Sequence, residues 1–432
     1  MPDGDTSVPR TSAEPVAELI AAGEAALARG DASAAFDVLG RAAAGHIGGA
    51  LLQRFATAFA TAGRYVARQD AVLAWVEQIL AQVVDPRERA SLLRARIAVC
   101  RQLDTARVLE LADEALAAAE AVGDHEAVAS VLANAAFAAY RRGDARGCRT
   151  FAERAAAASF ATRPAQYDAL RAQMFAANAA GELELVLQHN IKARVLAREI
   201  GHLGDQANAS NNLAEVYLEL GCPHEARACA ETAAQLARAT GFVALEATAT
   251  MYQGVATAEV GDIDGAIATF DRLRTAEHHP FSRIDAAAAH SYWLLERGAA
   301  GDARVARDAA EQVLEMTIRA GGDNRLTSLY ACIARAHMRE GHDDASRADL
   351  ERARKAADRA EPTALSMLAL AAAEVLPAAE PQRQVVLSGA RARILRRAAR
   401  REDPHAFCVN VRLNRRLLEL SGGVPADLPR SQ

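Results

Sequence analysis

Asparagine side chains are the most chemically suggestive group in this 432-residue chain, because they stand where helix-forming residues are expected. Asn208, Asn211 and Asn212 fall on adjacent turns of one amphipathic segment, although asparagine is a poor helix former. A carboxamide offers both a donor and an acceptor, so a row of them can pair with the backbone of an extended peptide. The alternative is structural: Asn208 caps the helix that begins there, and the others bond to neighbouring helices. The sequence leaves both interpretations open.

No catalytic motif is present in the sequence. It lacks a phosphate-binding glycine loop, a dinucleotide-binding glycine pattern, a His-Glu-x-x-His zinc motif and a Gly-x-Ser-x-Gly nucleophile elbow. This favours a noncatalytic protein, although a site assembled from distant helices would leave no linear motif.

Two clusters resemble metal sites: His278-His279-Pro280 and Gly341-His342-Asp343-Asp344. Both fall at breaks between helices, where polar residues are ordinary. The six cysteines include no Cys-x-x-Cys pair, which argues against a zinc site or a disulfide framework. We therefore expect neither a metal nor another cofactor.

A basic segment lies near the C-terminus. Between residues 388 and 420 there are nine arginines and only three acidic residues, Glu402, Asp403 and Glu419. Such a segment can bind phosphates, or it can dock as a cap against acidic helix ends. No DNA-reading motif accompanies it, so we do not expect nucleic acid as a partner.

The overall composition indicates close-packed helices. Apolar residues make up 51% of the chain, aromatic residues only 5%, and alanine is the commonest residue, while the net charge is only −5. This composition excludes a disordered chain. The first fifteen residues carry acids and prolines where a signal peptide would have a basic start and an apolar run, and every apolar stretch is too short to cross a bilayer. We therefore expect a cytoplasmic protein without membrane contact.

Glycines recur with a fixed period along the chain. Gly181, Gly221 and Gly261 are forty residues apart, with Gly301 and Gly341 on the same grid, and a second series of breaks falls halfway between. Each unit is therefore predicted to be two helices joined by short turns, the hairpin of a solenoid. No strand pattern competes with this prediction.

Small residues accompany the glycines in a constant phase. One unit shows Ala214, Tyr217, Gly221, Ala226 and Ala233, and others follow it less completely. This pattern resembles the tetratricopeptide repeat family, in its long-repeat variant of about forty residues, as in Rap-type and PlcR-type receptors and bacterial regulator sensor segments. HEAT or armadillo repeats, which have a similar period, are the structural alternative.

The resemblance implies an all-α, right-handed α-solenoid of about ten antiparallel helix hairpins. We expect a disordered segment at 1–13 and helical repeats at 14–360. Residues 361–420 are expected to form an irregular helical pair followed by a basic capping helix from Pro404 to Leu420, and residues 421–432 a flexible tail.

In that family the first helix of each hairpin lines the concave surface. Projected onto this sequence, the resemblance implies a ligand-binding face made of Asn134, Phe137, Tyr140, Arg141, Asp168, Arg171, Phe175, Asn178, Asn208, Asn211, Asn212, Glu215, Tyr252, Tyr292 and Arg335. Asn134 and Asn212 occupy the position of a clamp asparagine in chaperone-binding members, but no basic partners for such a clamp are evident.

The leading hypothesis is a regulatory or adaptor protein that binds a peptide or protein segment in its concave groove. A small-molecule sensor or enzyme with a pocket enclosed by the superhelix is one alternative. A structural assembly protein that forms a homodimer through its terminal repeats is the other.

Overall fold

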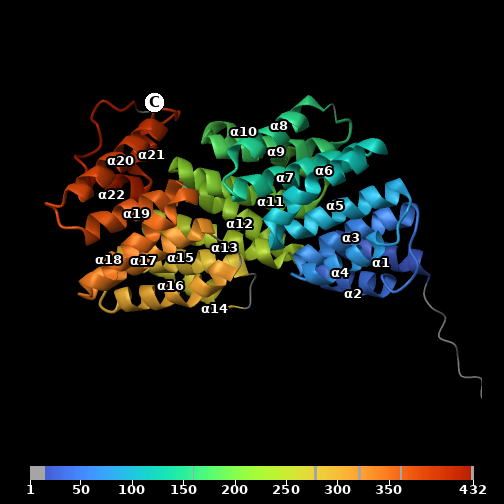
Figure 1. The fold of residues 1–432 in the computed structure, drawn as a ribbon, viewed down its shortest axis with the longest axis horizontal. Helices are drawn as coiled ribbons and strands as arrows, with labels where there is room; N and C mark the ends of the chain where they lie inside the picture. Colours follow the sequence, from blue (N-terminus) through green and yellow to red (C-terminus); the bar gives the residue numbers. More distant parts are fainter. Residues whose placement is uncertain (1–14, 159, 277–279, 320–322, 361, 430–432) are drawn as a thin grey trace, which may run out of the picture.

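The computed structural model describes residues 15–429 except 159, 277–279, 320–322 and 361. Within these residues the chain is entirely helical, with no strand. Antiparallel hairpins follow one another from the N-terminal helices, blue in Figure 1, to the C-terminal helices, red. None of the described helices combines the length and apolarity that a membrane span requires. The prediction of an α-solenoid of about ten hairpins is confirmed.

The described residues before 356 form nine hairpins. The first five are α1 (Val16–Ala28) with α2 (Ala32–Ala42), α3 (Ala50–Tyr65) with α4 (Gln69–Leu80), α5 (Pro86–Leu103) with α6 (Thr105–Ala121), α7 (His125–Arg141) with α8 (Ala145–Ala157), and α9 (Arg163–Ala180) with α10 (Leu183–Ile200). The next four are α11 (Leu203–Leu220) with α12 (Pro223–Ala239), α13 (Val243–Glu259) with α14 (Ile263–Thr275), α15 (Pro280–Arg297) with α16 (Asp302–Arg319), and α17 (Asp323–Arg339) with α18 (Asp343–Lys355).

The chain ends in a less regular C-terminal section. After a short 3-10 turn, η1 (Ala357–Arg359), it comprises α19 (Pro362–Val375), α20 (Pro381–Ala398), α21 (Pro404–Val409) and α22 (Arg412–Leu420). The single capping helix expected from Pro404 to Leu420 is thus two short helices. The bend between them allows the Asn410 amide to donate to the Gly221 carbonyl at 3.1 Å.

A glycine followed by an aspartate makes several of the turns. Gly143 adopts a φ of 70°, a left-handed conformation that glycine enters without strain, and so ends α7. Asp144 then caps α8 by accepting a hydrogen bond from the Gly147 amide at 2.9 Å. Gly261 and Asp262 repeat this arrangement before α14. The predicted glycine grid therefore marks helix ends, as the sequence indicated.

Small residues allow the two helices of a hairpin to approach closely. A Cβ atom added to Gly254 of α13 would lie 2.7 Å from the Phe270 ring of α14. Ala214, Ala226 and Ala233 are likewise fully buried in the unit of α11 and α12. Larger side chains here would separate helices that bury their apolar faces against one another.

Superhelical winding brings the N-terminal hairpins against the middle of the chain. Tyr65, at the end of α3, stacks on Phe242, just before α13, with ring centroids 4.2 Å apart. A Cβ on Gly30 would lie 1.7 Å from the Ala239 carbonyl oxygen of α12, so only glycine fits this contact. The solenoid thus makes contact with itself after about five hairpins.

The C-terminal section also lies against the middle of the chain and borders the inner side of the solenoid. In Figure 1 its red helices lie beside the green helices of the chain's middle. Val424 and Leu428, in the segment expected to be a flexible tail, pack against the C-terminal core. The disordered segment predicted at 1–13 lies outside the described residues.

Candidate functional site

The inner side of the solenoid contains a central cavity with a volume of about 530 Å³. Side chains of α5, α7, α9, α10, α11 and α13 form most of its wall. A second space, the N-side cavity of about 320 Å³, shares Arg101, Arg171 and Asn208 with it. The two cavities are therefore adjacent and share part of their walls.

Two further cavities adjoin the C-terminal section. The tail cavity, about 300 Å³, lies between α13, α15 and α22 and shares Glu215 and Tyr252 with the central cavity. The mouth cavity, about 470 Å³, lies between α7, α9 and α20 and shares Tyr140, Arg141 and Asn178. A ligand in the central cavity can therefore extend in more than one direction.

Carboxamides from three consecutive helices line the central cavity. They are Asn178 of α9, Asn190 of α10, and Asn208, Asn211 and Asn212 of α11. Asn208 lies within α11 and therefore does not cap its start. Its side-chain amide donates to the Gly204 carbonyl at 2.9 Å, one turn earlier in the same helix. The carbonyl oxygens of Asn190 and Asn211 have no hydrogen-bond partner among the described residues, although the two side chains are almost fully buried. Unpaired buried polar atoms are unusual in folded proteins and need an explanation.

Aromatic rings form a neighbouring part of the wall. Phe175 of α9 packs edge-on against Phe137 of α7, with centroids 5.3 Å apart, and lies roughly parallel to Tyr140 at 5.9 Å. The Tyr140 hydroxyl accepts a hydrogen bond from the Asn178 amide at 3.1 Å. The rings thus fix one of the carboxamides in place.

Arginines crowd the junction of the central and N-side cavities. The Arg101 guanidinium lies 5.2 Å from the Phe137 ring centroid and donates to the Asn134 carbonyl oxygen at 3.0 Å. Burial, followed by the positive charges of Arg171 and Arg64, holds the pKa of Arg101 well below its usual value. A positive charge is therefore costly here, and an anion placed beside it would be favoured.

The acids near this junction are already engaged. Arg171 pairs with Asp168 at 2.7 Å, yet burial still raises the pKa of Asp168 above its usual value. Burial acts in the same direction on Asp205, but its hydrogen bond with His202 and the charge of that histidine leave its pKa lowered. Arg171 is thus already paired, whereas Arg101 bonds only a neutral amide among the contacts described above.

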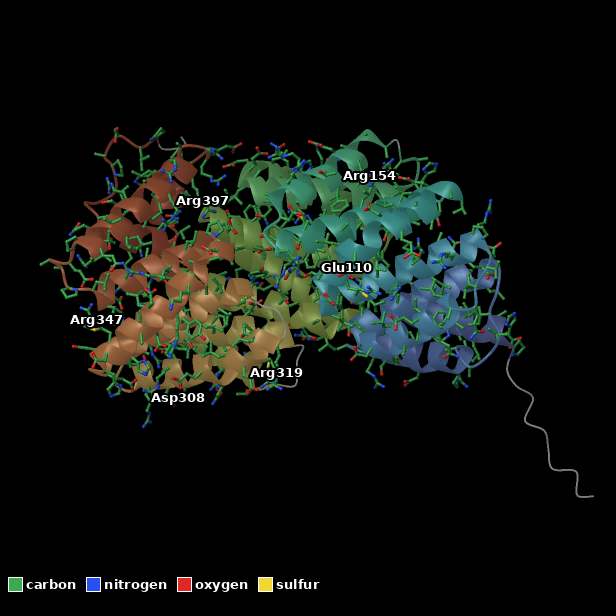
Figure 2. The ribbon with its side chains drawn as sticks, viewed as in Figure 1. Glu110, Arg154, Asp308, Arg319, Arg347 and Arg397 are labelled. Atoms are coloured by element: carbon green, nitrogen blue, oxygen red, sulfur yellow. The ribbon has the colours of Figure 1, made fainter. Side chains whose placement is uncertain are left out.

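The basic C-terminal segment docks onto acidic residues of the repeats. Arg397 pairs with Glu219 of α11 at 3.0 Å, and Arg401 pairs with Glu184 of α10 at 2.7 Å. Figure 2 shows Arg397 where the red helices meet the green ones. The Arg412 backbone amide also donates to the Glu259 carboxylate at 3.3 Å. The basic segment was expected either to bind phosphates or to dock as a cap, and these contacts show it docked as a cap.

The tail cavity has mostly apolar walls. Met251 and Val255 come from α13, Trp293 from α15, and Phe407 and Leu413 from the C-terminal section. Glu259 reaches the same cavity, and burial raises the pKa of its carboxyl to about 7. The C-terminal section thus supplies part of a binding wall as well as a cap.

Comparisons with known proteins bear on the fold. No protein-family model matches the chain, and no curated protein sequence does. A crystal structure of NprR in complex with its cognate peptide NprX is similar, with a TM-score of 0.51, 11% sequence identity and coverage of 76% of this chain and 97% of that one. The chain has a tetratricopeptide-like fold.

Two other solved structures resemble this tetratricopeptide-like solenoid at lower TM-scores. A Rap protein complexed with competence and sporulation factor matches at 0.49, with 15% identity over 80% of this chain and 99% of that one. An IFIT1 monomeric mutant with Gppp-AAAA matches at 0.49, with 12% identity over 95% of this chain and 90% of that one.

Most of the residues projected onto the concave face of the solenoid do line its cavities. Those in the central cavity are Phe137, Tyr140, Arg141, Arg171, Phe175, Asn178, Asn208, Asn211, Asn212, Glu215 and Tyr252. Asn134 and Asp168 line the N-side cavity, and Tyr292, which is 8% exposed, lines the tail cavity. The structure thus places these side chains on the walls of three adjacent cavities that share lining residues.

Arg335 does not line any of the four cavities described here, although the projection placed it on the ligand-binding face. It is 1% exposed, and its guanidinium bonds Glu296 at 2.8 Å and Glu374 at 2.9 Å, so no donor group faces the four cavities described here. Its charge is neutralised inside the helix stack, and we correct the predicted face by removing it.

Sequence reasoning also missed side chains of the site. Arg101 was overlooked because the projection began at the following hairpin, and it supplies the basic partner that Asn134 was expected to lack. Asn190 was overlooked because it lies on the second helix of its hairpin. The sequence nevertheless pointed to Asn190, since it is another asparagine in the middle of a helix. His278 and His279 lie outside the described residues.

Proposed function

We propose that this solenoid is a noncatalytic regulator or adaptor that holds an extended peptide segment in its central cavity. The observation that carries the proposal is the row of carboxamides on α9, α10 and α11 along one cavity wall. A peptide in extended conformation presents an N–H and a C=O at each residue, and a carboxamide can pair with either. Two of these carboxamides have carbonyl oxygens without partners in the described structure.

The cavities beside the central one favour a chain-like ligand over a compact one. The N-side cavity offers the guanidinium of Arg101, whose hydrogen bond within the described structure is to the neutral amide of Asn134, and this suits an acidic group of the peptide. The tail cavity offers apolar walls that include Trp293 and Phe407, which suit a large apolar side chain. We propose a peptide that carries both kinds of group.

The comparison with NprR supports this proposal, because that protein was crystallised in complex with its cognate peptide NprX. The similarity extends over most of both chains. A fold of this kind is therefore compatible with binding of a peptide.

Selection from a displayed library of short random peptides tests the proposal. The selected sequences are synthesised with a fluorophore, and their binding is measured by anisotropy against the wild type, Asn212→Ala and the control Gln235→Ala. Gln235 is an exposed amide on α12, outside the cavities described above. We expect enriched peptides to bind the wild type and the control equally and Asn212→Ala at least about tenfold more weakly, a difference of about 1.4 kcal/mol. Equal binding to all three would contradict the proposal.

A small-molecule sensor is the second candidate function. Its support is the pair of buried acids with raised pKa values, Asp168 and Glu259, because perturbed acids gather at ligand sites. Native mass spectrometry of the gently purified protein separates the two functions, since a copurified peptide and a copurified metabolite differ in fragmentation.

A further inference from the structure

The turn between α17 and α18 gathers two histidines and a glutamate. One ligand atom from each of His337, Glu340 and His342 lies within 4.8 Å of the others. Gly341 makes this possible, because its φ of 79° reverses the chain and lets the His342 amide donate to the His337 carbonyl at 2.9 Å. The imidazole rings of the two histidines consequently approach to 5.8 Å between centroids.

His337 is held in a defined orientation from behind. Its Nδ1 lies 2.9 Å from Oδ2 of Asp349, a residue of α18 that is 3% exposed. A carboxylate in this position fixes a proton on Nδ1, so the lone pair of Nε2 faces away from it. Metal-binding histidines are characteristically braced by a carboxylate in this way.

We propose that His337, Glu340 and His342 bind one divalent transition-metal ion, with water completing its coordination. Two imidazole nitrogens and one carboxylate oxygen suit Zn²⁺, Co²⁺ or Ni²⁺, whereas Mg²⁺ and Ca²⁺ prefer oxygen ligands alone. Tetrahedral ligands about 2.0–2.1 Å from a zinc ion lie about 3.3 Å apart, so the three atoms must close by at most about 1.5 Å. His342 is exposed, so a change of its side-chain rotamer can supply this movement.

Glu340 can bind both Arg307 and a metal ion, because its carboxylate has two oxygens. One carboxylate oxygen, Oε2, accepts from Arg307 of α16 at 2.5 Å. The other oxygen remains for a metal, and Arg307 then orients the ligand carboxylate as Asp349 orients His337. The ion would fasten the end of α17 to the start of α18. This inference does not rest on peptide binding.

Isothermal titration of the tag-free, chelator-treated chain with ZnCl₂ tests the site, and MgCl₂ serves as the control ion. The variants are His337→Ala, His342→Ala and Asp349→Asn. The matched control is His224→Ala, which removes an exposed histidine near the start of α12. Far-UV circular dichroism of each variant confirms that it is folded.

We expect one equivalent of Zn²⁺ to bind and no heat from Mg²⁺. Each histidine variant should weaken zinc binding at least about 100-fold, and Asp349→Asn about tenfold through the loss of the brace, while His224→Ala leaves it unchanged. Absence of zinc binding by the wild type would overturn the proposal. So would zinc binding that survives both His337→Ala and His342→Ala, because the ion would then reside elsewhere, for example on Cys222 or Cys229.

Discussion

The guanidinium of Arg401 lies 2.7 Å from the carboxylate of Glu184, although 217 residues separate them in the sequence. Arg401 also donates to the Gly181 carbonyl at 3.1 Å and lies 5.5 Å from the Phe407 ring centroid. These contacts attach the C-terminal section to the fifth hairpin. They convert an open-ended solenoid into one whose inner space is bounded by its own C-terminus.

Replacement of Arg401 by alanine should detach this section. The Arg401 side chain is 1% exposed, so the substitution leaves Glu184 without its partner and removes the group packed on Phe407. Loss of one member of a buried ion pair costs about 3–5 kcal/mol, and the lower value applies because Glu184 is partly exposed. We expect a clear fall in the denaturation midpoint and faster proteolysis of residues after 403.

Arg400→Ala is the control for this prediction, because Arg400 is the exposed neighbour of Arg401. It should leave both the midpoint and the cleavage rate close to those of the wild type. If the two variants behave alike, the contact between Arg401 and Glu184 does not hold the C-terminal section in place.

Asn211→Ala distinguishes a binding role from a structural role. The carbonyl oxygen of Asn211 has no partner in the described structure, so its removal deletes an unsatisfied buried group and should leave the stability unchanged within about 1 kcal/mol. Binding of a selected peptide should nevertheless weaken about tenfold, as measured by anisotropy. A large loss of helical content or stability would support the structural interpretation instead.

Arg101→Gln should weaken binding selectively. Its positive charge is buried beside the charges of Arg171 and Arg64, and we expect an acidic group of the ligand to relieve this repulsion. Affinity for a selected peptide with an aspartate or glutamate should fall about tenfold, while affinity for the corresponding amide peptide changes little.

The control for this prediction is Arg146→Gln, which neutralises an exposed arginine of α8. It should not discriminate between the acidic peptide and its amide counterpart. An equal loss for both peptides in Arg101→Gln would show that Arg101 acts only by supporting Asn134.

The hairpin arrangement was predictable from the sequence because it depends on local chemistry repeated at a fixed period. Gly143 and Asp144 show this, since one residue ends a helix and the next caps another. The face toward the cavities followed from the same phase, which is why Asn178 and Asn212 were identified.

Contacts between repeats were less predictable than the hairpins, and those between distant repeats were the least predictable. Arg335 bonds Glu296 and Glu374, each 39 residues away, so the three charges occupy equivalent positions of successive repeats. Opposite charges at the spacing of the repeat were a signal in the sequence that Arg335 is buried in ion pairs. The pairing of Arg401 with Glu184 had no such signal, because it depends on how far the superhelix winds before its ends meet. Superhelical winding is the sum of small rotations per repeat, which no local pattern specifies.

Glu259→Gln should remove a pH dependence of stability. Burial raises the pKa of this carboxyl to about 7 from its ordinary value of 4.5, and Glu296 adds to the increase while Arg412 and Arg415 oppose it. The folded protein therefore binds this proton more tightly than the unfolded chain. The resulting stabilisation is complete below pH 4.5 and is lost as the pH rises through about 7. The loss is on the order of 3 kcal/mol.

Glutamine keeps a carbonyl oxygen for the Arg412 amide but cannot ionise. Wild type and Glu259→Gln should thus be about equally stable near pH 5, and the variant should be the more stable by about 2–3 kcal/mol near pH 8. Denaturant unfolding at a series of pH values measures this difference, and Glu231→Gln, at an exposed position of α12, should show none. A difference that is the same at every pH would mean that folding leaves the pKa of Glu259 unshifted, so that its carboxyl is ionised in the folded protein from about pH 5 upward. The tail cavity would then hold a permanent negative charge, which is incompatible with the apolar side chain that we assign to it.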